Sequence, residues 1–85
     1  MNLGLILAII SHAGLLLHTE QDVESIAKNI FFAHSEKFPS KAEGLKLLDD
    51  CLNVLGSGVF AGIPAEVLSK INEVLNELVK VVNTL

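Results

Sequence analysis

Residues 67–85 read VLSKINEVLNELVKVVNTL, and this stretch decides the fold because its apolar residues recur with a helical period. A 4-3-4-3-4 spacing separates the members of one unbroken apolar row, which are Val67, Ile71, Val74, Leu78, Val81 and Leu85. Such a row is typical of a helix that packs lengthwise against another helix. A second row widens the apolar face and consists of Leu68, Leu75 and Val82. We therefore predict a helix near residues 64–84 and interpret the first row as an interaction seam.

The preceding segment carries a start signal and a stop signal for another helix. Residues 40–43 read SKAE, a capping box in which the Ser and Glu side chains can each bond a free backbone N–H. The sequence GSG at residues 56–58 ends the apolar pattern, as expected just past a helix. These signals predict a helix over residues 41–55. Pro64 is placed at the first position of the helix that follows.

An acidic helix is predicted earlier in the chain, near residues 20–34. Thr19 can cap its first turn, where Glu20 and Asp22 also favour the positive end of the helix dipole. The helix should stop before the linker at residues 35–40, because Pro39 disfavours helical geometry in the residue before it.

The first nineteen residues contain no formal charge, and residues 3–17 read LGLILAIISHAGLLL. Three interpretations stay open. A secretory signal requires a positively charged start, whereas the first Lys here is Lys28. A membrane span requires about 20 apolar residues, more than this stretch supplies. A helix near residues 3–18 that is enclosed by protein on nearly all sides is the interpretation we favour.

Together these segments predict an all-α single domain, residues 1–85, built as a small bundle of about four antiparallel helices. Because 51% of the 85 residues are apolar, so short a chain should leave apolar surface uncovered. We therefore expect an oligomer or a protein partner. Side chains expected to contact a partner or lipid are Leu3, Leu7, Ile10, Leu17 and Phe32.

Composition and spacing point away from catalysis and from nucleic acid. The chain has ten acidic residues against six basic ones, all Lys, and a net charge of −4, so it lacks the cationic surface that binds phosphates. The only cysteine, Cys51, lies among leucines and is expected to be buried and inert. Asp49 and Asp50 are expected to lie on a solvated edge. The three histidines have no metal-ligand spacing, so no catalytic, cofactor or metal site is predicted.

The layout of the chain is an apolar first helix, a short acidic helix, a capped central helix and the ending INEVLNELVKVVNTL at residues 71–85. This layout resembles small orphan helical proteins encoded by tailed bacteriophages. The resemblance implies a phage origin and a place in a virion, and it implies no active-site residue.

These observations favour a non-catalytic structural or assembly protein, located in a virion or the cytoplasm, that associates with itself or with other assembly proteins. Two alternatives remain. One is a membrane-inserting protein of holin-like or bacteriocin-like type, which would act through residues 3–17 at a membrane. The other is a small acidic inhibitor or adaptor of a host protein.

Overall fold

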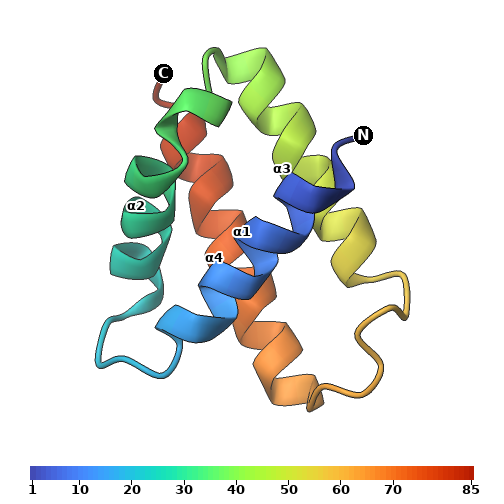
Figure 1. Ribbon diagram of the computed structural model, residues 1–85. Helices are drawn as coiled ribbons and strands as arrows, with labels where there is room; N and C mark the ends of the chain where they lie inside the picture. Colours follow the sequence, from blue (N-terminus) through green and yellow to red (C-terminus); the bar gives the residue numbers. More distant parts are fainter.

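Four stretches of the chain are α-helical, and they follow the apolar periods of the sequence. The computed structural model describes residues 1–85 and contains α1 (Leu3–Leu16), α2 (Val23–Ala33), the short 3-10 helix η1 (Ser35–Lys37), α3 (Lys41–Leu55) and α4 (Ala65–Val82) (Figure 1). No segment forms a strand. The predicted all-α class is confirmed, and so is the number of main helices.

The boundaries of α3 are those predicted. The hydroxyl of Ser40 accepts a hydrogen bond from the backbone N–H of Glu43 at 3.3 Å, which satisfies one free donor of the first turn. The helix ends at Leu55, and Gly56 is its C-cap. Gly58 then has a φ of 92°, a left-handed conformation that suits glycine and turns the chain toward α4. Pro64 caps α4 from one position outside the helix.

The start of α2 differs from the prediction. Asp22 is the N-cap, and its side chain accepts a hydrogen bond from the backbone N–H of Ser25 at 2.8 Å. Thr19 instead donates its hydroxyl proton to the carbonyl of Leu16, 2.6 Å away, at the end of α1. Because Thr19 closes the preceding helix, α2 begins only at Val23.

The helices form two layers. In Figure 1, α4 lies between α2 and α3, and α1 crosses this layer diagonally. The Cα atoms span 33 × 29 × 17 Å, and the shortest dimension matches two helices stacked face to face. The most extensive interhelical contact joins α2 and α4, followed by α3 with α4.

The directions of the helices only partly match an antiparallel bundle. Helix α3 runs opposite to α4, as predicted, whereas α2 runs in the same direction as α4 (Figure 1). The cause is that α2 and α3, although consecutive, do not pack extensively on each other. The linker around η1 carries the chain from one side of α4 to the other, so α2 and α3 flank α4 on opposite sides (Figure 1).

Most of the predicted seam packs inside the chain. Ile71, Val74 and Leu78 are buried, Val67 and Val81 are half-buried, and Leu85 is exposed. They join a core of 17 buried residues that draws on α1, α2, α3 and α4 together with Phe38. Helices α1, α2 and α3 therefore cover the seam, and most of it offers no free surface to a second molecule.

Helix α1 is enclosed on one side only. Its core face is fully buried and consists of Ile6, Ile9, Ile10 and Ala13. The expectation that Ile10 contacts a partner is wrong, because only 2% of its surface is exposed. The opposite face is exposed and carries Gly4, Ala8, Ser11 and Leu15. None of the four helices combines the length and the apolar composition that a membrane-spanning segment needs.

Helices α3 and α4 approach closely at a glycine. A Cβ atom at Gly44 would lie 2.8 Å from Val82 Cγ1 and 3.1 Å from Phe38 Cδ1, closer than carbon atoms normally pack. Phe38, at the end of the linker, is 4% exposed and packs near Phe31, with 5.5 Å between the ring centroids. Glycine at position 44 therefore allows the start of α3 to lie against the end of α4.

Candidate functional site

A groove of about 590 Å³ lies where α1 ends and where α2 and α4 both begin; we call it the basal groove. Its less exposed residues are Gly14, Leu17, Gln21, Val23, Ile26 and Val67. Its exposed residues are His18, Asp22, Glu66 and Lys70. A concave, mostly apolar surface of this size bordered by a few polar groups is typical of a binding site.

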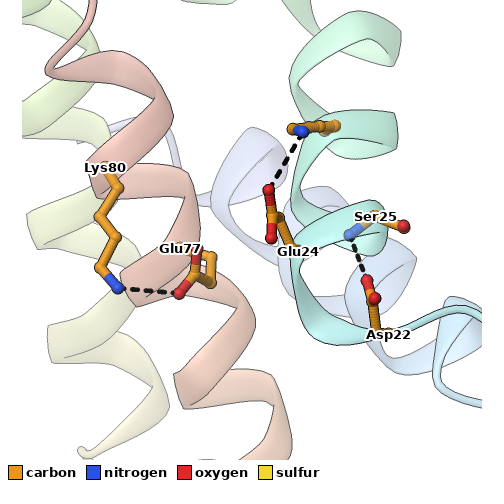
Figure 2. Close-up of polar contacts among 6 residues, drawn as sticks. Asp22, Glu24, Ser25, Glu77 and Lys80 are labelled. Carbon is orange, nitrogen blue, oxygen red and sulfur yellow. Dashed lines mark hydrogen bonds and ion pairs between the residues drawn. The ribbon is translucent and has the colours of Figure 1, made fainter.

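Two of the polar groups that border the basal groove, Asp22 and Lys70, are held in place by residues close in sequence. Figure 2 shows the Asp22 carboxylate against the backbone N–H of Ser25. This hydrogen bond is the main cause that lowers the pKa of Asp22, so the group is ionised at neutral pH. Lys70 pairs with Glu73 at 3.4 Å on the next turn of α4. A similar short-range pair, Lys80 with Glu77 at 2.9 Å, lies further along α4 (Figure 2).

A pair of histidines forms a second polar feature. The Nδ1 atom of His12, in α1, lies 3.4 Å from Nε2 of His34, the C-cap of α2, and both rings are half-buried. The rings meet edge to face, with an interplanar angle of 69°. Every other side-chain hydrogen bond joins residues at most eight positions apart, so this is the one polar side-chain contact between distant segments.

The environment of the His pair favours the neutral form of His34. Burial lowers the pKa of His34 below its usual value, and the neighbouring His12 lowers it further. Sequence reasoning missed this pair because a separation of 22 positions carries no periodic signal. Only the packing of α1 against α2 brings the two rings together.

The thiol of the only cysteine, Cys51, is enclosed by the fold. Cys51 is buried, as predicted, and burial together with the nearby Asp50 raises the pKa of its thiol to about 12. The thiol is therefore protonated at neutral pH and has little nucleophilic character.

The expectation for Asp50 is wrong. Its surface is only 8% exposed, and it accepts a hydrogen bond from Lys46 Nζ at 2.8 Å. That bond, one turn along α3, raises the pKa of Lys46. The carboxylate is thus a paired group inside the fold, whereas Asp49 is exposed.

Large apolar side chains remain on the surface. Two of the predicted partner contacts are exposed, Leu3 at 52% and Phe32 at 72%. Leu7 and Leu17 are half-buried, and Leu17 borders the basal groove. Leu85, the last member of the predicted seam, is also exposed, and the sequence prediction did not include the other exposed large apolar residues, which are Met1, Leu15 and Val59.

The fold and these features define a small all-helical protein with a basal groove, a His pair and exposed apolar side chains. No protein-family model, no curated protein and no solved structure matches the chain.

Proposed function

We propose that the protein is a non-catalytic assembly module that associates with further copies of itself. The observation that carries this proposal is the exposed large apolar surface. Phe32 and Leu15 are each about seventy per cent exposed, although the same chain buries seventeen other residues in its core. Exposed aromatic side chains such as Phe32 are enriched where protein surfaces meet.

The chemistry of the remaining groups supports the same proposal. The thiol of Cys51 is protonated and enclosed, the Asp50 carboxylate is paired with Lys46, and no buried polar side-chain atom lacks a partner. These groups act in the stability of the fold and are not presented to a substrate. The resemblance of residues 71–85 to phage proteins supports placing the module in a virion.

The size of the apolar surface sets the expected strength of association. Burying one Phe or Leu side chain contributes roughly 2 kcal/mol, and a stable interface usually buries about 800 Å² on each partner. Six scattered side chains fall short of that area by themselves. We therefore expect a contact of moderate strength that also uses the half-buried residues around the basal groove.

Native mass spectrometry and light scattering over a concentration series, from about 1 µM to 1 mM, test this proposal. The wild-type chain should assemble as its concentration rises, and Phe32→Ser should shift the transition to higher concentration. Asn72→Ser, a substitution at an exposed polar position on α4, is the matched control and should leave assembly unchanged. A chain that stays monomeric over the whole series would overturn the proposal of self-association.

A further inference from the structure

The His pair places two metal-ligating nitrogen atoms opposite each other, one on α1 and one at the end of α2. We infer that His12 and His34 form a two-imidazole binding site for a divalent transition metal ion of the Zn²⁺, Ni²⁺ and Cu²⁺ class. The inference does not depend on the proposed assembly function, because it rests only on contacts within one chain.

The distance between the two nitrogen atoms fits this class of ligand. Two nitrogen ligands at ~2.05 Å from a tetrahedral zinc ion lie about 3.3 Å apart, by the geometry of the tetrahedron. The Nδ1 atom of His12 and the Nε2 atom of His34 are 3.4 Å apart. The metal would therefore need rotation of the rings but no movement of α1 relative to α2.

The tautomers that imidazole rings can adopt also fit. A neutral imidazole offers one lone pair, and the tautomer is set by where its single proton resides. In the present hydrogen bond one of the two facing nitrogen atoms carries that proton. If this proton sits on the other nitrogen of the same ring, both facing atoms offer lone pairs, and the pair binds the ion without releasing a proton.

The surroundings supply few competing charges. Helix α1 contains no Asp, Glu, Lys or Arg, so no ionised side chain on α1 accompanies His12. The charged residues of α2, Glu24 and Lys28, pair with each other at 3.1 Å. Nowhere in the chain do three or more His, Cys, Asp or Glu side chains gather to hold a metal ion, so water would fill the remaining coordination positions.

The third histidine gives the experiment a matched control. His18 is exposed and lies outside the pair. Zn²⁺ is titrated up to ~1 mM into the full chain, with isothermal calorimetry for stoichiometry and the unfolding temperature as a second readout. Wild type and His18→Gln should bind one ion per chain and unfold at a higher temperature when zinc is present. His12→Gln and His34→Gln should each lose at least about tenfold in affinity.

A further measurement needs no variant and therefore holds even if a substitution weakens the fold. Electron paramagnetic resonance of the wild-type chain with one equivalent of Cu²⁺ should show two imidazole nitrogen ligands. One imidazole ligand or none would overturn the inference. It would also fail if wild type showed no saturation by ~1 mM zinc, if His34→Gln bound as tightly as wild type, or if His18→Gln abolished binding.

Discussion

Replacing Gly44 by alanine has two opposing effects on stability, because the added Cβ disturbs the packing of α3 on α4 while alanine favours the helix. An added Cβ would lie 2.8 Å from Val82 Cγ1, whereas carbon atoms pack best at about 3.5–4.0 Å. Val82 is fully buried and Phe38 is 4% exposed, so neither neighbour can retreat into solvent. Overpacking of this kind costs about 1–3 kcal/mol, against a gain of about 1 kcal/mol from placing alanine in a helix.

We therefore expect Gly44→Ala to destabilise the chain by about 1 kcal/mol, which lowers the unfolding temperature by roughly 4–8 °C. Gly14→Ala is the matched control, because its Cβ would meet Ile71 Cδ1 at an ordinary 3.8 Å. That substitution should stabilise by about 0.5–1 kcal/mol. Thermal and urea unfolding followed by circular dichroism give both values.

The two glycines should thus respond with opposite signs. Equal stabilisation by both substitutions would refute the close approach of α3 to α4 at Gly44. A double-mutant cycle locates the clash: Gly44→Ala with Val82→Ala should be less destabilised than the sum of the single changes. Additive effects would mean that Val82 is not the residue that Gly44 accommodates.

Three other predictions concern the core, the thiol and the His pair. Leu78→Asp should cost several kcal/mol and unfold the single chain, since Leu78 is fully buried, whereas Asn76→Asp on the exposed face should be nearly silent in urea unfolding. Cys51, whose pKa burial raises to about 12, should not react with a thiol reagent at pH 8 until urea unfolds the chain. Because folding lowers the pKa of His34, the contribution of this residue to the free energy of unfolding should be fully present above pH 6.5 and should be lost as the pH falls below that value. The measurement is made in EDTA to exclude bound metal, and His34→Gln should flatten the pH dependence.

Local signals in the sequence account for the helices. The capping residue Ser40 and the glycine at position 56 fix both ends of α3, because each acts on backbone groups a few residues away. The start of α2 was missed because Thr19 and Asp22 are both good caps, and the choice depends on where α1 ends. The 4-3 spacing of Ile71, Val74 and Leu78 correctly marks a packing face.

The same spacing cannot say which helix covers that face. In this chain α2 and α3 cover the face from the two sides of α4. The prediction from sequence had assigned that role to a partner molecule. The sites escaped prediction for a related reason. The basal groove and the contact of His12 with His34 arise where segments distant in sequence cross, and periodicity reports only on neighbours along one helix.

The crossing of α1 over the other helices has a consequence during synthesis. Helix α1 leaves the ribosome first, yet the layer that it covers is complete only when α4, at residues 65–82, has emerged. Until then the core around Ile6, Ile9 and Ile10 is incomplete, and such transiently uncovered apolar segments are prone to aggregate or to be held by chaperones. A nascent chain halted near residue 60 should therefore recruit a holdase, and the full-length chain should release it.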